Sequence, residues 1–215
     1  VMNRIALLAV VVCLGLFANG NLVAAATLTT LHTFTGVDGD APVAGLALGT
    51  NGNFYGTTEF GGTSANCLDG CGTVFEISSS GAFTSRHSFT NYDGSGPRGA
   101  LVQGSDGNFY GTTFAGGFFG PGGIGTVFRM TASGVLTRIH SSDIDGNCGN
   151  DPESVLLEGN DGNFYGTTYF TVYRITTNGV CTTLNVALGG GKAGLIYGTN
   201  GTFYGTTQFG GTSTN

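Results

Sequence analysis

Three closely spaced carboxylates are the residues of this chain best arranged to hold a metal ion. Asp143, Asp145 and Asp151 lie in the segment "DIDGNCGND", and such an oxygen-rich pattern suits calcium. The segment has no closing bidentate Glu, which a complete calcium loop would supply. The alternative is that each Asp accepts hydrogen bonds from its own turn. Calcium is therefore the one cofactor that the sequence suggests, with these three residues as its candidate ligands.

Four cysteines beyond residue 26 could form disulfides. "CLDGC" places Cys67 and Cys71 across a short loop, which predicts a bridge in an exported protein. Cys148 and Cys181 form a weaker candidate pair, because we expect them near opposite ends of a repeat unit. A zinc site is not expected, since the four cysteines show no C-x-x-C spacing.

Three histidines recur at equivalent places, in "LHTF", "RHSF" and "IHSS". His32, His87 and His140 would then lie in three different outer strands, too far apart to share one metal ion. We expect them to pack or to form hydrogen bonds. The same separation argues against a Ser-His-acid triad.

The first 26 residues resemble a secretory signal peptide. Arg4 precedes the apolar run Ile5–Phe17, and Ala24-Ala25-Ala26 follows as a small-residue cleavage site. The run is too short to cross a bilayer, which needs roughly 20 residues. We expect cleavage near Thr27, a secreted or cell-surface location, and no membrane insertion of the segment 27–215.

The composition favours an all-β protein and excludes some partners. Formal net charge is −6, charged residues make up 9% of the chain, and 41 of 215 residues are glycine. The absence of a basic stripe argues against nucleic acid as a partner. Many β-branched and aromatic residues between glycines are typical of short strands and tight turns.

These strands belong to an internal repeat. "NGNFYGTT", "DGNFYGTT" (twice) and "NGTFYGTT" place Gly52, Gly107, Gly162 and Gly201 at spacings of 55, 55 and 39 residues. A "GTVF"-like marker follows the first three copies in the same order, which indicates true repetition. The aromatic pair in each copy should be core: Phe54, Tyr55, Phe109, Tyr110, Phe164, Tyr165, Phe203 and Tyr204.

Each repeat is expected to form four antiparallel strands. In the second copy they should span about 100–103, 108–113, 126–131 and 135–141, joined by glycine turns. Such units of about 55 residues predict a kelch-like β-propeller, with a stacked-strand solenoid as the alternative. The expected repeats are 43–89, 98–141, 153–186 and a truncated 193–215, with 28–34 as a stray outer strand. The array is incomplete, with three blades and part of a fourth.

Length differences between repeats fall on one set of loops. The connections from second to third strand, and from one repeat to the next, vary in length, whereas the other turns are uniform. We therefore expect the variable loops to form one face that recognises a ligand. The alternative is ordinary solvated turns. The loops concerned are Glu59–Cys71, Phe114–Ile124, Thr35–Pro42, Thr90–Pro97 and Ser142–Pro152.

The "DGNFYGTT…GG…GTVF" unit resembles that of the GloVer, or choice-of-anchor, tandem-repeat proteins of bacteria. The resemblance covers nearly all of residues 28–215 and implies export and a repeat architecture, without supplying catalytic residues. In that family an anchor domain follows the repeats, so we expect a longer protein. A weaker similarity is to the propeller repeats of bacterial sensor ectodomains.

The sequence thus predicts a non-catalytic, exported scaffold or binding module for an extracellular glycan or protein. The alternative is a propeller enzyme acting on polysaccharide, whose paired carboxylates would have to meet over the central channel. The repeated inner-strand motif carries no acid, which favours binding over hydrolysis.

Overall fold

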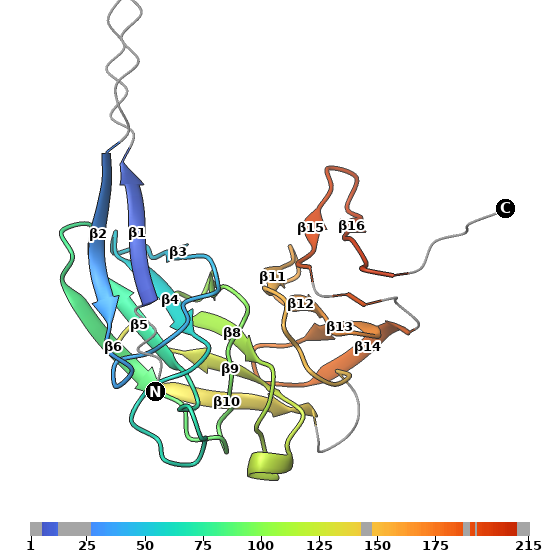
Figure 1. The fold of residues 1–215 in the computed structure, drawn as a ribbon. Helices are drawn as coiled ribbons and strands as arrows, with labels where there is room; N and C mark the ends of the chain where they lie inside the picture. The colour runs from blue at the N-terminus through green and yellow to red at the C-terminus, as the bar shows by residue number, and fades with distance from the viewer. Residues whose placement is uncertain (1–5, 13–26, 143–147, 187–189, 192, 210–215) are drawn as a thin grey trace, which may run out of the picture.

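The computed structural model describes residues 6–12, 27–142, 148–186, 190–191 and 193–209 (Figure 1). Within these residues the chain forms β-strands and one short 3-10 turn, Gly120–Gly122. No helix in the described part of the chain is long and apolar enough to cross a membrane. The expectation of an all-β protein is confirmed.

Three antiparallel sheets of four strands form the body of the molecule (Figure 1). Blade 1 contains β3 (Ala47–Leu48), β4 (Phe54–Thr58), β5 (Thr73–Ile77) and β6 (Phe83–Ser88). Blade 2 contains β7 (Val102–Gln103), β8 (Phe109–Thr113), β9 (Thr126–Met130) and β10 (Leu136–Ser141). Blade 3 contains β11 (Leu157–Glu158), β12 (Phe164–Thr167), β13 (Thr171–Ile175) and β14 (Cys181–Val186). A fourth unit pairs β15 (Ile196–Tyr197) with β16 (Phe203–Tyr204).

This arrangement is that of a β-propeller. Each blade pairs its strands in chain order, and each outer strand carries a register shift opposite its neighbour, which increases local twist. The predicted incomplete array, three blades and part of a fourth, is confirmed for the described residues. The solenoid alternative is wrong, because each repeat closes its own four-stranded sheet instead of contributing strands to a continuous stack.

The strand β2 (Thr27–Phe34) lies outside the blades. Phe34 contacts the rings of Phe75 and Phe83 in blade 1, while β2 pairs antiparallel with β1 (Ala6–Val12). The sequence places 1–26 outside the fold as a signal peptide. In the uncleaved chain, the apolar part of this segment forms β1 and pairs with the edge of β2. An open strand edge favours such pairing with an apolar, β-branched segment. Cleavage near Thr27 stays a prediction.

The repeated Phe-Tyr pair joins neighbouring blades. Tyr55 packs on Phe109 with ring centroids 4.0 Å apart, and Tyr110 packs on Phe164 at the same distance. Tyr165 packs on Phe203 at 4.2 Å. Each tyrosine therefore contacts the phenylalanine of the next repeat, which explains why the motif recurs.

Most of the predicted core aromatics are buried: Tyr55, Phe109, Tyr110, Phe164 and Tyr165. Phe54 and Phe203 are half-buried. Tyr204 is an exception at 50% exposure, since none of the described residues forms a further blade over it. Position in the array, as well as residue type, thus decides burial.

The glycine after each Phe-Tyr pair serves packing within a blade. A Cβ at Gly111 would collide with the ring of Phe128 on β9 and with Leu101, and Gly56 stands in the same relation to Phe75. The aromatic side chain of the third strand therefore crosses directly over the glycine of the second strand.

Candidate functional site

The turns between first and second strands are closed structural units. Asp106 accepts hydrogen bonds from the Asn108 backbone N–H at 3.0 Å and from the Tyr110 hydroxyl at 2.8 Å. Asp161 repeats this arrangement with Asn163 and Tyr165. Burial raises the pKa of Tyr110, and the bond to Asp106 raises it further, so the hydroxyl stays protonated and donates. Asp106 and Asp161 therefore each accept hydrogen bonds from within their own hairpin.

Two of the histidines bind a carboxylate in the loop that enters the next blade. His32 Nε2 lies 2.8 Å from Asp38 Oδ2, and His87 Nε2 lies 2.8 Å from Asp93 Oδ2. The other oxygen of Asp93 accepts bonds from the Thr90 backbone and hydroxyl at 2.7 and 2.9 Å. Burial alone would raise the pKa of Asp93, but the bonds from His87 and Thr90 outweigh it and lower that pKa.

These pairs confirm the expected hydrogen-bonding role of His32 and His87. Their acid partners were not predicted from the sequence, although Asp38 and Asp93 each follow the histidine by six positions. The threonine of each unit bonds to the carboxylate and not to the imidazole. The group therefore fixes the loop that enters the next blade and is not a nucleophilic triad. We call this hydrogen-bonded pair the Asp-His lock.

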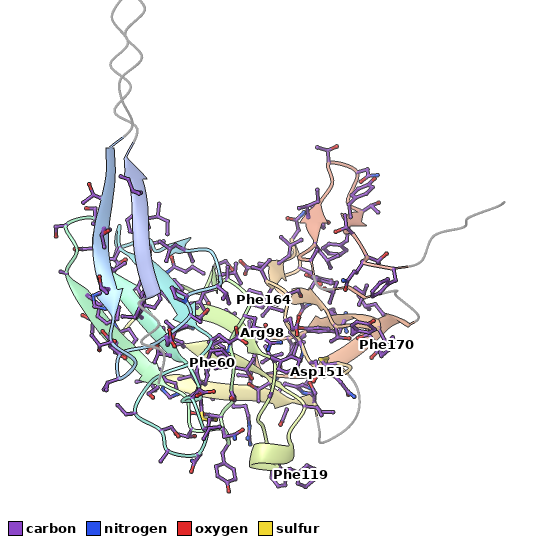
Figure 2. All side chains as sticks on the ribbon, in the orientation of Figure 1. Phe60, Arg98, Phe119, Asp151, Phe164 and Phe170 are labelled. Carbon is purple, nitrogen blue, oxygen red and sulfur yellow. A yellow bond between two sulfur atoms is a disulfide. The ribbon has the colours of Figure 1, made fainter. Side chains whose placement is uncertain are left out.

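A cavity of about 320 Å³ lies where the variable loops of blades 2 and 3 meet. Two of its lining residues, Asp151 and Phe170, are labelled in Figure 2. Carboxylates and aromatic rings line the cavity together. Its lining residues are Phe114, Asn150, Asp151, Glu153, Tyr169, Phe170 and Gly191. All of these come from loops following a second strand or entering a blade, the set that the length variation singles out. We call this cavity the loop pocket.

Arg98 holds two walls of the loop pocket in place. Its Nε donates to Glu59 Oε1 at 2.8 Å and its Nη1 donates to Glu153 Oε1 at 2.7 Å. The guanidinium also lies 3.9 Å above the centre of the Phe114 ring, a cation–π contact. Glu59, Arg98 and Glu153 belong to three successive repeats, so a single side chain ties three blades together at this face. These contacts could not be predicted from the sequence, because no local motif links residues 39 and 55 positions apart.

Of the three candidate calcium ligands, the structure describes Asp151. It lines the loop pocket and has a positive φ of 55°, which Asp tolerates better than most residues. Asp143 and Asp145 lie outside the described residues, so the calcium site stays a prediction. Among the described side chains, the group close enough to share a metal ion is His140, Cys148 and Cys181.

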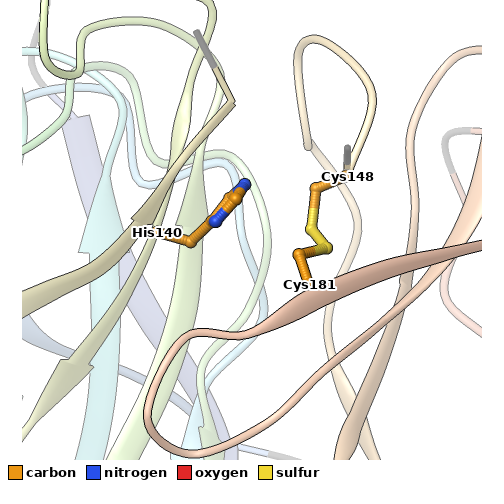
Figure 3. A group of neighbouring side chains, drawn as sticks. All are labelled: His140, Cys148 and Cys181. Carbon is orange, nitrogen blue, oxygen red and sulfur yellow. A yellow bond between two sulfur atoms is a disulfide. The ribbon is translucent and has the colours of Figure 1, made fainter. Parts of the chain in front are cut away.

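Both cysteine pairs form disulfides in the structure. Cys67 and Cys71 are joined across their loop, with Cα atoms 5.2 Å apart, and Cys148 and Cys181 are joined with Cα atoms 5.8 Å apart. The expectation that Cys148 and Cys181 lie at opposite ends of a unit is wrong. They meet in the space between neighbouring blades, where the entering loop faces β14 and where His140 of β10 also points (Figure 3).

Several exposed aromatic side chains lie on the variable loops without lining the loop pocket. Phe118 and Phe119 are 57% and 62% exposed and form an edge-to-face pair. Tyr92 is 58% exposed in the loop that enters blade 2. Phe119 lies beside the short 3-10 turn, away from Asp151 and Phe170 (Figure 2). Because Phe119 is as exposed as Phe170 of the loop pocket, at 62% and 61%, it is a suitable comparison for that residue.

Solved structures share this architecture. A catalytically inactive virginiamycin B lyase from Staphylococcus aureus, crystallised with quinupristin, is 19% identical with a TM-score of 0.57, covering 80% of this chain and 50% of the lyase. A second structure of that lyase is 14% identical with a TM-score of 0.56, covering 94% of this chain and 53% of the lyase. The extracellular domain of a B. thetaiotaomicron protein described as a hybrid two-component system is 12% identical with a TM-score of 0.54. The match covers 85% of this chain and 23% of that domain's chain. At these identities the likeness shows the propeller fold alone, and the chain spans about half the length of the lyases.

No curated protein matches the chain. A family model does match, over residues 20–215, and its description is the Gloeobacter/Verrucomicrobia repeat. The match covers all four copies of the "FYGTT" motif and the blades that they build. The chain therefore belongs to the Gloeobacter/Verrucomicrobia repeat family, as the resemblance of its repeat predicts.

Proposed function

We propose that this protein is an exported, extracellular or cell-surface binding module, and that the loop pocket binds a glycan. The observation that carries the proposal is the composition of the pocket wall. Phe114, Tyr169 and Phe170 supply aromatic surface, and Asp151 and Glu153 supply carboxylates, around one cavity. The N-terminal segment, which has the features of a signal peptide, supports the extracellular location.

This wall suits a carbohydrate. Ligand sites combine apolar and aromatic surface with a few polar groups that fix orientation. A sugar ring presents an apolar C–H face to an aromatic ring and hydroxyl donors to a carboxylate. The volume of about 320 Å³ is at the small end of ligand cavities and suits one or two sugar rings.

The pocket is also held in shape before any ligand arrives. Arg98 fixes Glu153 through a hydrogen bond and Phe114 through its cation–π contact. The Glu59 and Glu153 side chains are 14% and 13% exposed, so water competes little for the ion pairs. A preformed wall lowers the entropy lost on binding.

Calorimetric titration of a panel of extracellular oligosaccharides tests the proposal. Tyr169→Ala and Phe170→Ala should each weaken binding of the best oligosaccharide by tenfold or more, because each removes an aromatic stacking surface; for stacked nucleobases the same change costs on the order of 1–3 kcal/mol. Phe119→Ala is the matched control, since it removes an aromatic ring from the same face outside the pocket. Equal effects of all three variants, or no oligosaccharide binding to the wild-type chain, would refute the loop pocket as a glycan site.

A second candidate is a propeller enzyme that acts on polysaccharide. Asp151 and Glu153 both line the loop pocket, and paired carboxylates are the usual machinery of glycoside hydrolysis. The lyase among the solved structures shows that a propeller can carry catalysis, although fold does not fix function. Release of reducing ends by the wild-type chain, abolished in Asp151→Asn, would establish the enzyme; unchanged polysaccharide with retained binding would favour the binding module.

A further inference from the structure

Three equivalent positions recur around neighbouring outer strands in each of the three described blades. The first is a histidine on the preceding outer strand, the second a residue in the loop entering the blade, and the third the first residue of that blade's own outer strand. The trios are His32, Asp38 and Phe83; His87, Asp93 and Leu136; and His140, Cys148 and Cys181.

Backbone contacts establish that the loop positions are equivalent. The carbonyl of Asp38 accepts a bond from Thr73 Oγ1 at 3.3 Å, and that of Asp93 accepts one from Thr126 Oγ1 at 3.2 Å. In the third repeat the carbonyl of Cys148 accepts the same bond, from Thr171 Oγ1 at 3.3 Å. Cys148 therefore occupies the place of the two aspartates, even though the loop leading to it is longer.

Strand register establishes the third position. Phe83 pairs with Ile77 at the start of β6, and Leu136 pairs with Met130 at the start of β10. Cys181 pairs with Ile175 at the start of β14. In the first repeat the Phe83 ring stacks on the His32 imidazole with centroids 3.7 Å apart, so this position faces the histidine.

The third repeat thus keeps the histidine and changes both of its neighbours to cysteine. The ligand atoms of His140, Cys148 and Cys181 all lie within 4.8 Å of one another (Figure 3). Cys148 is fully buried and His140 is 9% exposed. A disulfide alone would replace the Asp-His lock with a covalent one, whereas a Cys₂His set offers two soft ligands and an imidazole.

We propose that His140, Cys148 and Cys181 form a redox-controlled site for a thiophilic divalent metal ion such as zinc. In the oxidised chain Cys148 and Cys181 form the disulfide. A dithiol reductant would donate two electrons and two protons, break the S–S bond and become a disulfide itself. A zinc ion then binds both sulfurs and the neutral imidazole, and the two thiol protons leave to solvent. Three protein ligands leave a fourth position of the tetrahedron for water.

Both states of the site tether the same loop. The disulfide joins Cys148 to Cys181 of β14, and a metal ion would join it to Cys181 and to His140 of β10. Asp151 follows Cys148 by three residues and lines the loop pocket. The metal would therefore substitute for the disulfide under reducing conditions. This inference does not depend on what the loop pocket binds.

Cobalt titration of the reduced full-length chain tests the site. We expect one Co²⁺ per chain, with a thiolate-to-cobalt charge-transfer band that Zn²⁺ displaces. Cys148→Ser or Cys181→Ser should abolish the band, and His140→Ala should weaken cobalt binding at least tenfold. The control is Cys67→Ser, which breaks the other disulfide and should leave the band intact, because that pair is not part of the three-ligand group.

A second readout needs no variant and covers the case in which a substitution prevents folding. Zinc should protect Cys148 and Cys181 of the reduced wild-type chain from alkylation, measured for each cysteine by peptide mass spectrometry, while Cys67 and Cys71 react at their unliganded rate. It should also raise the melting temperature of the reduced chain. Equal protection of all cysteines, or no cobalt binding by a reduced chain that is folded by circular dichroism, would show a structural disulfide and overturn the proposal.

Discussion

One residue type does different work at equivalent positions of this array. Tyr55 and Tyr110 are buried between blades and pack on the phenylalanine that follows one repeat later. Tyr204 occupies the same motif position and is half exposed. Cys148 and Asp93 occupy equivalent loop positions in successive repeats. Asp93 bonds to His87, whereas Cys148 forms a disulfide with Cys181. At the residue scale, contacts with the neighbouring repeat therefore decide what a motif position contributes.

The tyrosine comparison gives a stability prediction. Tyr110→Ala should lower the free energy of unfolding by on the order of 3–5 kcal/mol, because it empties a buried aromatic site. Tyr204→Ala, the matched change at an exposed site, should cost much less. Urea denaturation measures both. Equal losses would mean that the Tyr-on-Phe contact does not stabilise the junction between blades.

The Asp-His lock formed by His87 and Asp93 gives a pH prediction. The pKa of Asp93 is lowered in the folded protein from an ordinary value of 3.8, so its ionised form stabilises the fold above that value. This stabilisation is lost as the pH falls through the folded pKa. Wild type should therefore exceed Asp93→Asn in unfolding free energy at about pH 5, and the gap should close towards about pH 2.

Urea denaturation at a series of pH values measures this gap. Asp69→Asn provides the control, since Asp69 is exposed in its loop. A gap between wild type and Asp93→Asn that stays constant over the whole range would mean that Asp93 acts through shape and not through charge.

At the element scale, most of the fold could be predicted and most of the site could not. The strands expected at 100–103, 108–113, 126–131 and 135–141 correspond to β7, β8, β9 and β10, because alternation and turn glycines are local signals. The contacts of Arg98 with Glu59 and Glu153 join residues of different repeats. Such contacts depend on how the blades pack against one another. A repeat motif predicts that packing, but it does not predict which non-repeated side chains meet there.

Two glycines of one hairpin allow the strand packing to be tested. Gly107 has a positive φ of 81° with open space at its Cβ, whereas a Cβ at Gly111 would meet Phe128 and Leu101. Gly107→Ala should cost about 1 kcal/mol of strain, and Gly111→Ala should cost more, because buried ring atoms must move. Denaturant midpoints compare them. The reverse order would mean that the turn, and not the ring crossing, limits the blade.

At the scale of the whole molecule, the blades form a rigid support for variable loops. Aromatic stacking joins successive blades near their inner strands, and Arg98 joins three of them at the loop face. The loops can then differ between repeats without loss of the fold. This division between a repeated core and a non-repeated face is the physical basis of the proposed binding role.

The N-terminal segment gives a prediction about the whole chain. We expect the secreted protein to begin near Thr27, which would remove β1 and leave the edge of β2 unpaired by it. N-terminal sequencing of protein recovered from the medium or the cell surface measures this directly. Recovery of residues 1–26 on the exported protein would instead make the β1–β2 pair a permanent part of the molecule.

The most direct test of the proposed binding role compares an aspartate of the loop pocket with an aspartate of a hairpin turn. Asp151 lines the pocket at a backbone position that Asn also tolerates, while Asp106 is bonded within its own turn. Oligosaccharide binding to Asp151→Asn and Asp106→Asn would be measured by calorimetric titration, with melting curves to show that both fold. We expect loss of binding in Asp151→Asn and retention in Asp106→Asn; loss in the Asp106 variant alone would refute the loop pocket as the binding site.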